Sequence, residues 1–247
     1  MSKPYLSLII PVRDESKTVL QTLISVDYAL SISEFSSEVI VSDDGSRDTT
    51  PNIVLQYEKV LKPLKCIEGK SRRGFGQAIN DGMNAANGNV RVIMYPSCVG
   101  FLDKREDILS AFKEGYDIVV GSRNIGTGKL SLKRGVKKAF RKLSNKLMCG
   151  KELRGISDVS FGAVCMTEEM SDWLFSFPEL SDSSNIFFDI YMLAYSNGAR
   201  IKEIEYSDSD LCACRSGVWS WVSAFFHSVG ARRRAAKKKK IGALILE

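Results

Sequence analysis

Histidine is almost missing from this chain, with His227 the one example among 247 residues. A Ser-His-Asp or Cys-His mechanism is therefore not expected. Six cysteines are present, but none form a Cys-x-x-Cys pair, so we do not expect a zinc site either. Reduced thiols in a cytosolic protein are the simplest interpretation of cysteines scattered in this way.

Long apolar runs are also missing. No stretch of about 18 apolar residues occurs, so we expect no transmembrane helix. The first residues lead almost directly into a predicted strand and lack the basic, apolar and small-residue regions of a signal peptide. With 247 residues, 44% of them hydrophobic, the chain is long enough for one α/β domain with a substantial core.

Positive charge gathers in two stretches, which together exceed the net formal charge of +6. The first covers residues 129–151, includes Arg134, and has apolar residues at helical spacing: Val136, Phe140, Leu143 and Leu147. It predicts a basic amphipathic helix that contacts a membrane surface. The alternative is a helix that packs on the core and leaves a solvated basic face.

The second basic stretch is C-terminal. Aromatic and apolar residues between Trp219 and Val229 precede a polybasic run from Arg232 to Lys240. Such a segment suits an anionic membrane surface, where each basic residue contributes about 1 kcal/mol before salt screening. A solubilising or nucleic-acid-binding arm is the alternative, but no helix-turn-helix signature accompanies it and we expect no nucleic-acid partner. We predict a domain of residues 1–217 and a membrane-surface tail of residues 218–247.

The chain runs twice from a predicted strand through an acidic turn into a helix. The first strand, residues 5–10, ends at Pro11-Val12-Arg13-Asp14-Glu15, and helical spacing follows at Val19, Leu20, Leu23 and Ile24. The second strand, residues 39–41, enters Asp43-Asp44-Gly45 before a helix that opens near Thr49-Thr50-Pro51. This order is typical of a parallel sheet, whose ligands bind beyond the carboxyl ends of the strands.

Both acidic turns should therefore lie side by side at one edge of the sheet. Carboxylates placed there can accept hydrogen bonds from a nucleobase edge and from ribose hydroxyls. The alternative is an ordinary acidic turn, with Asp48 or Thr49 capping the helix that follows.

Six segments with a common order extend this pattern. They are Pro11-Val12-Arg13-Asp14-Glu15, Val41-Ser42-Asp43-Asp44-Gly45-Ser46, Arg72-Arg73-Gly74-Phe75-Gly76-Gln77-Ala78 (with Gly82, Ala86 and Gly88), Val119-Val120-Gly121-Ser122-Arg123, Ser157-Asp158-Val159-Ser160-Phe161-Gly162, and Phe188-Asp189-Ile190 with residues 198–204. Together they resemble the family 2 glycosyltransferases with the GT-A fold over roughly residues 5 to 220. Within that family the likeness is greatest to dolichyl- or polyprenyl-phosphate sugar synthases.

The resemblance implies a single GT-A (Rossmann-like) α/β domain, with a mostly parallel central sheet and helices on both faces. It also implies an activity, the transfer of a hexose from a GDP- or UDP-linked sugar to polyprenyl or dolichyl phosphate, with inversion at the anomeric carbon. The acceptor implies a protein held at the cytoplasmic face of a membrane, where it could meet a membrane-protein partner. Because a phosphate oxygen is already an anion, such a reaction needs no general base.

The same resemblance assigns residues to three roles. Those that contact the nucleoside are Pro11, Arg13, Glu15, Asp43 and Asp44. Those near the donor phosphates are Arg73, Gly74, Gly76, Tyr95, Ser97 and Arg134. Those that act on the reacting groups are Arg123, Asp158 and Arg215.

Several of these residues have plainer interpretations. Gly74 and Gly76 could form a simple turn instead of a phosphate site at a helix N-terminus. Asp158 could cap a turn or orient a neighbouring arginine, and Arg134 could be one more basic residue of its helix. Asp189 could face the cleft or the solvent.

The resemblance fails at the metal site. The family has a D-x-D motif after the strand that here is residues 90–94, but this chain has Tyr95-Pro96-Ser97. A phenol and a hydroxyl are poor substitutes for the carboxylates that Mg²⁺ or Mn²⁺ prefers, so a metal requirement is doubtful and we assign no metal ligand. The nearby acids are expected to begin the next helix: Asp103, Glu106 and Asp107.

Two hypotheses follow from this departure. One is a metal-independent enzyme in which arginines neutralise the leaving diphosphate. The other is a non-catalytic GT-A protein that binds nucleotide sugar or lipid phosphate as a partner or regulatory subunit.

Overall fold

The computed structural model of the protein describes residues 3–61, 63–123, 153, 156–159, 161–180 and 185–206. Its strands are β1 (Leu6–Val12), β2 (Ser37–Asp43), β3 (Leu64–Ile67), β4 (Val90–Met94), β5 (Ile118–Ser122), β6 (Ala163–Thr167) and β7 (Ile201–Glu205). Its helices are α1 (Val19–Ser31), α2 (Thr50–Tyr57), α3 (Phe75–Ala85), η1 (Pro96–Lys104), α4 (Arg105–Lys113), α6 (Glu168–Phe175), η2 (Pro178–Leu180) and α7 (Ile186–Ser196). None of the helices within these ranges is both long and apolar enough to cross a bilayer.

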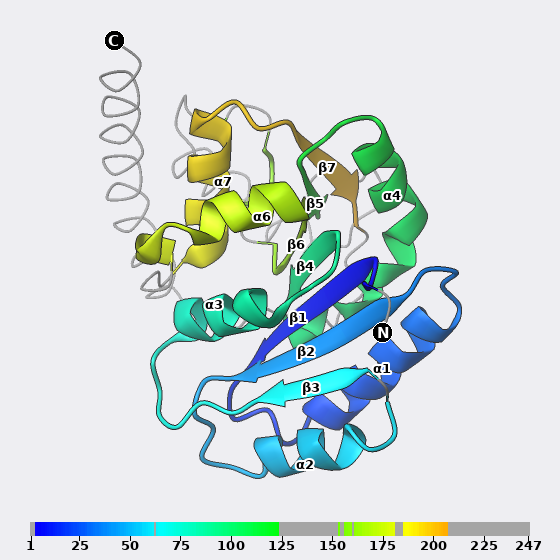
Figure 1. The fold of residues 1–247 in the computed structure, drawn as a ribbon, viewed down its shortest axis with the longest axis vertical. Coiled ribbons are helices and arrows are strands. Elements are labelled where there is room, and N and C mark those ends of the chain that lie inside the picture. Colours follow the sequence, from blue (N-terminus) through cyan, green and yellow to red (C-terminus); the bar gives the residue numbers. More distant parts are fainter. Residues whose placement is uncertain are drawn as a thin grey trace, which may run out of the picture.

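The strands form one sheet in the order β3-β2-β1-β4-β6-β5-β7 (Figure 1). Within the described ranges β6 alone runs antiparallel to its two neighbours, β4 and β5, and the remaining pairs are parallel. The predicted α/β class with a mostly parallel sheet is confirmed. The strands at its centre are buried on both sides, as their nearly continuous apolar sequences indicate.

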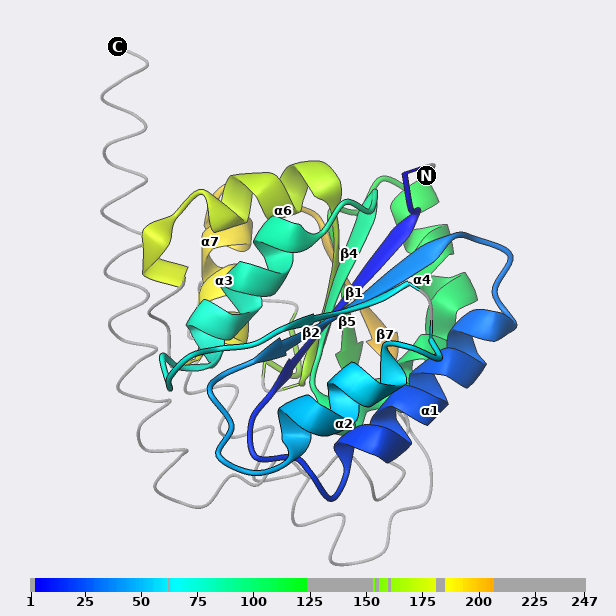
Figure 2. The same cartoon turned by 60° about the horizontal axis from the view of Figure 1, so that its bottom comes forward.

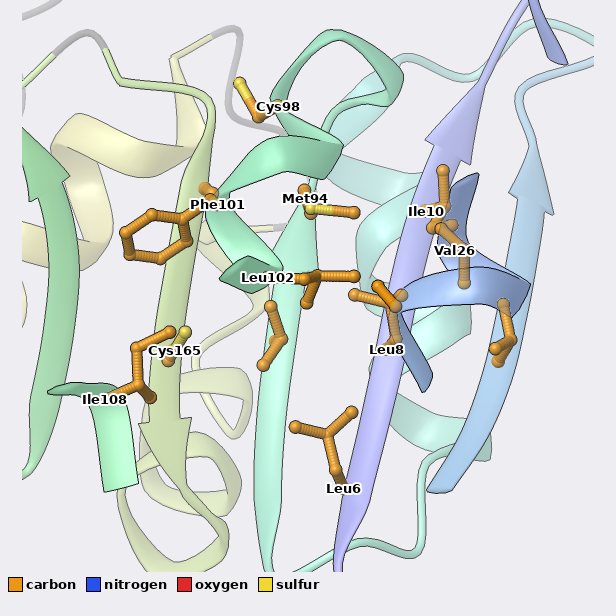
Figure 3. Close-up of a cluster of buried hydrophobic side chains, with 14 of the residues drawn as sticks. Leu6, Leu8, Ile10, Val26, Met94, Cys98, Phe101, Leu102, Ile108 and Cys165 are labelled. Carbon is orange, nitrogen blue, oxygen red and sulfur yellow. The ribbon is translucent and has the colours of Figure 1, made fainter. Parts of the chain in front are cut away.

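Helices cover both faces of the sheet, as predicted. Figure 2 shows α3, α6 and α7 on one side and α1, α2 and α4 on the other. Alternate residues of β1 divide between two apolar clusters, because successive side chains of a strand point to opposite faces. Leu8 and Ile10 pack with α1 and η1, as Figure 3 illustrates, while Ile9 packs with α3.

Two local predictions need correction. Pro11 does not end the first strand, since β1 continues through Val12 and Pro11 lies opposite Ser42 of β2. The first helix forms as predicted, but Leu20 and Ile24 are 46% and 44% exposed, and its buried side is made by Val19, Thr22, Leu23, Val26 and Ala29. The amphipathic pattern gave the helix correctly and its buried face only in part.

Strand directions place the loops of interest at one edge. The turns after β1, β2, β4 and β5 follow the carboxyl ends of parallel strands, and the loop before β6 meets them because β6 runs the opposite way. Four strand spacings separate β2 from β5, or roughly 19 Å along this edge. Asp44 and Arg123 therefore lie at the same edge of the sheet, as the sequence required.

Candidate functional site

The turns after β1 and β2 are joined by hydrogen bonds. Asp14 has a positive φ of 50°; its backbone N–H donates to Ser46 Oγ at 2.9 Å, and its carboxylate accepts the backbone N–H of Arg47 at 2.7 Å. The backbone N–H of Glu15 donates to Thr50 Oγ1 at 2.8 Å. The prediction that these turns lie side by side is confirmed, and polar contacts fix their spacing.

Asp48 extends this link between the two turns. Its carboxylate accepts the backbone N–H groups of Ser16 and Thr50, at 3.0 and 2.9 Å. Burial acts to raise the pKa of Asp48, but the hydrogen bonds from Thr50 and Ser16 outweigh it and hold the pKa well below its usual value. Thr49 is the N-cap residue of α2 by position, but its side chain makes no capping bond. Asp48 is thus a structural acid that the capping alternative identified in part.

Asp43 closes its own turn. Its Oδ2 accepts the backbone N–H of Ser46 at 2.9 Å, and its Oδ1 accepts the Ser46 hydroxyl. The residue is only 3% exposed. A ligand that reached this carboxylate would share it with Ser46.

Asp44 holds three groups from two other segments. Its Oδ1 accepts the backbone N–H groups of Arg73 and Gly74, at 2.8 and 2.7 Å. Its Oδ2 accepts from Arg13 Nη1 at 3.3 Å. Since Asp44 is 3% exposed, it acts here as a clamp between the second turn and the loop that leads into α3.

Two glycines allow this loop to approach the second turn. Gly45 has φ +65°, and a Cβ on it would lie 2.4 Å from the backbone carbon of Ser71. A Cβ on Gly69 would lie 2.4 Å from the backbone oxygen of Asp43. Backbone runs against backbone at both positions, which leaves no room for a side chain.

Gly74 is the N-cap residue of α3, with φ +100°, and Gly76 is buried in the first turn of the helix. Nothing lies within 4 Å of a Cβ placed on Gly74, so this glycine meets a backbone requirement and not a packing requirement. The neighbouring Arg73 pairs through Nη2 with Asp81, in the middle of α3. Arg73 and both glycines are therefore at the carboxyl edge, as predicted.

Tyr95 occupies the position where a carboxylate was expected after β4. Its ring centroid lies 5.5 Å from that of Phe75 and 5.0 Å from that of Phe187. A Cβ on Gly162 would come within 2.8 Å of the Tyr95 ring, so the glycine provides the space that the ring fills. Tyr95 is thus packed as an aromatic residue among three other elements.

The residues after β4 do not fit a divalent metal site. Ser97 Oγ lies 3.9 Å from Cys98 Sγ, and Asp107 pairs with Lys104 at 3.8 Å, in the α4 region. Within the described ranges, no three histidine, cysteine, aspartate or glutamate side chains are grouped as metal ligands. The acids expected to begin the next helix divide between two elements: Asp103 lies in η1, and Glu106 and Asp107 lie in the first turn of α4.

Arg123 follows β5 directly and makes a two-point ion pair with Asp158. Its Nε donates to Oδ2 at 2.7 Å and its Nη2 to Oδ1 at 3.0 Å. The guanidinium also lies 5.7 Å from the centroid of the Phe161 ring. The two side chains are 6% and 0% exposed. Of the alternatives for Asp158, orientation of an arginine is the one that the geometry matches.

The other predicted residues have mixed outcomes. Arg134, Arg215, the basic stretch of residues 129–151 and the tail of residues 218–247 lie outside the described residues. Asp189 is 4% exposed in α7, so its interpretation as a surface acid is wrong. Sequence reasoning gave no role to Ser46 or Thr50; hydroxyl residues just after an acidic turn were the available signal.

Fold and edge together define a GT-A-type α/β domain, and two solved structures share this architecture. Glucosyl-3-phosphoglycerate synthase from Mycobacterium tuberculosis, in complex with phosphoglyceric acid, has a TM-score of 0.66 at 16% identity, over 94% of this chain and 80% of that one. TarS of S. aureus (residues 1–349) has a TM-score of 0.55 at 18% identity, over 82% of this chain and 60% of that one. At these identities the likeness supports the fold alone.

The chain belongs to glycosyl transferase family 2, whose model matches residues 7–170. A dolichyl-phosphate beta-glucosyltransferase of Trichomonas vaginalis is 28% identical over 185 residues, which are 70% of this chain and 55% of the relative. A dolichol-phosphate mannosyltransferase of Pyrococcus furiosus is 28% identical over 175 residues, which are 66% of this chain and 46% of the relative. The chain thus spans about half the length of these curated relatives.

Proposed function

We propose that this protein transfers a hexose from a nucleotide sugar to a polyprenyl or dolichyl phosphate, with inversion and without a divalent metal. The observation that carries the proposal is the common edge: the acidic turn at Asp43 and Asp44 and the guanidinium of Arg123 stand on strands of one sheet. Family membership and the names of the two relatives support a sugar transfer to a lipid phosphate.

In the proposed reaction, an anionic oxygen of the acceptor phosphate attacks the anomeric carbon of the donor hexose. The bond between that carbon and the leaving phosphate oxygen breaks, and its electron pair stays on the nucleoside diphosphate. No proton has to be removed from the nucleophile, which agrees with a chain that has one histidine. The protein supplies position and charge neutralisation.

Arginines provide that neutralisation in the proposal. Arg123 is held rigidly at the edge by Asp158, and Arg73 stands at the N-terminus of α3, where backbone N–H groups also favour an anion. Arg134 and Arg215 are assigned to the same task by the family resemblance. Metal independence rests on Tyr95, whose ring is packed where a carboxylate ligand was expected.

A membrane-surface location belongs to the same proposal. The acceptor carries its phosphate at a bilayer surface, so the catalytic domain has to stay near that surface. The basic residues of 129–151 and the polybasic tail of 218–247 would hold it there through anionic lipids. Binding of the full chain to vesicles with and without anionic lipid tests this part separately.

The decisive experiment is a transfer assay on the full chain. UDP- and GDP-linked hexoses are offered with polyprenyl phosphate, in chelator and in added Mg²⁺ or Mn²⁺, and the lipid-linked sugar is measured. We expect product in chelator, its loss in Arg123→Ala, and unchanged product in Tyr28→Ala, a control on α1 that is 70% exposed. Complete loss of product in chelator, restored by metal, would reject metal independence.

A binding-only function is the second candidate, and the aromatic packing of Tyr95 is the observation that favours it. Such a protein would bind nucleotide sugar or lipid phosphate without converting either. Calorimetric titration with the nucleotide sugar, run beside the transfer assay, separates the two. Saturable binding with no product under any metal condition would replace the enzyme with a binding protein.

A further inference from the structure

Glu203 is a carboxylate on an otherwise apolar face of the sheet. It lies in β7 opposite Val120 of β5, and paired residues of neighbouring strands point to the same side. Val120 belongs to the apolar cluster that includes Ile190 and Tyr191 of α7. Burial raises the pKa of Glu203 above its usual value, and the nearby negative charge of Asp158 acts in the same direction. An acid in this setting needs hydrogen-bond donors.

The donors come from the segment that carries Asp158. Oε1 of Glu203 accepts the backbone N–H of Ser157 at 2.7 Å and that of Asp158 at 3.0 Å. The Ser157 hydroxyl lies 3.2 Å from the same oxygen and 2.7 Å from the hydroxyl of Ser122, the last residue of β5. One carboxylate oxygen therefore fixes two successive peptide units just before β6.

This contact is one step away from Arg123. Glu203 fixes the backbone of Asp158, and the Asp158 carboxylate fixes the guanidinium through two parallel hydrogen bonds and accepts the backbone N–H of Arg123 at 3.2 Å. Each link is short and directional, so a shift of the Ser157–Asp158 backbone would change where the guanidinium stands.

We propose that Glu203 is a positioning residue that sets the Arg123 guanidinium, through Asp158, for the phosphate groups of the reaction. The proposal rests on the proposed function for the identity of those phosphates. Glu203 touches neither substrate in this scheme. Its role is to hold the guanidinium before the substrates arrive, so that the reaction does not have to order it.

The test uses four forms of the full chain: wild type, Glu203→Ala, Glu203→Gln and the control Glu205→Ala. Glu205 is an exposed acid two residues further along the same strand. Two quantities are measured in each form, the affinity for inorganic pyrophosphate and the kcat and KM of hexose transfer. Thermal unfolding confirms that each form is folded.

Misplacement of a charged group by about 1 Å can cost about 100-fold in rate, so Glu203→Ala should lower kcat by about 10- to 100-fold with little change in the KM for the donor. Pyrophosphate affinity should fall with it. Glu203→Gln should retain most of both, because its amide oxygen can still accept the two backbone N–H groups. Glu205→Ala should resemble the wild type.

A double substitution separates positioning from a general loss of stability. In an Arg123→Ala background, Glu203→Ala should cause no further fall in pyrophosphate affinity or in rate. A further fall of the same size, or an equal effect of Glu205→Ala, would overturn the proposal. If the wild type transfers no hexose, the proposed function fails, while the pyrophosphate measurements still decide the role of Glu203.

Discussion

Asp44 and Gly74 are joined by a 2.7 Å hydrogen bond from the backbone N–H of Gly74 to Oδ1 of Asp44. The same oxygen accepts the N–H of Arg73, so the carboxylate at the end of β2 sets the position from which α3 begins. Two backbone groups that could otherwise face a donor phosphate are occupied by this clamp. The acidic turn thus shapes the phosphate side of the candidate site as well as its nucleoside side.

The first prediction concerns this clamp. Asp44→Ala removes an acceptor that serves two buried N–H groups and the partner of Arg13, and should lower the free energy of unfolding by about 1–3 kcal/mol. Asp44→Asn keeps an oxygen for both N–H groups and should cost less. Urea denaturation measures both values. Equal losses in the two variants would contradict the clamp, and donor affinity should follow the same order.

The second prediction concerns the pair of Arg123 and Asp158. Asp158→Ala leaves a guanidinium that is 6% exposed without its carboxylate, which should cost about 3–5 kcal/mol of unfolding free energy. Replacing both residues, as Arg123→Met with Asp158→Leu, should recover much of this loss because no charge is left buried. Denaturation of the three forms checks the order, and a double variant as unstable as Asp158→Ala would contradict it.

The third prediction concerns Tyr191 in α7. Its hydroxyl is fully buried and has no hydrogen-bond partner within the described part of the chain. Burial raises the pKa of Tyr191 well above its usual value, with smaller contributions from Asp158 and Glu203. Tyr191→Phe removes an unsatisfied group and keeps the ring, so stability should stay equal or rise by about 1 kcal/mol. A loss above about 1 kcal/mol on thermal unfolding would mean that the hydroxyl has a partner.

The fourth prediction concerns pH. The folded-state pKa of Asp48 lies below its usual value of 3.8, so the folded state favours the charged form. Its contribution to stability is therefore present above about pH 4 and is lost as the pH falls below that value. Asp48→Asn should flatten the acid limb of the stability profile between about pH 4 and pH 2 relative to wild type. Exposed Asp103→Asn is the control and should leave the limb unchanged, since Asp103 lies away from these turns.

Local sequence determined the elements that carry the site. The apolar runs of β1, β2 and β4 and the acidic residues after the first two gave the strands, their turns and their common edge, because burial of a strand leaves a pattern in its own residues. The position of Arg123 after β5 followed from the same reasoning. Family resemblance added roles that no periodicity could supply.

Tertiary structure decided which groups hold one another. Asp158 and Arg123 are 35 positions apart, and Glu203 reaches Ser157 across 46, contacts that depend on the strand order β6-β5-β7. The packing of Tyr95 between Phe75 and Phe187 likewise joins three distant segments. A sequence records that a residue is buried or charged, but its partner is chosen by which strands become neighbours, and that choice is made by the packing of the whole sheet.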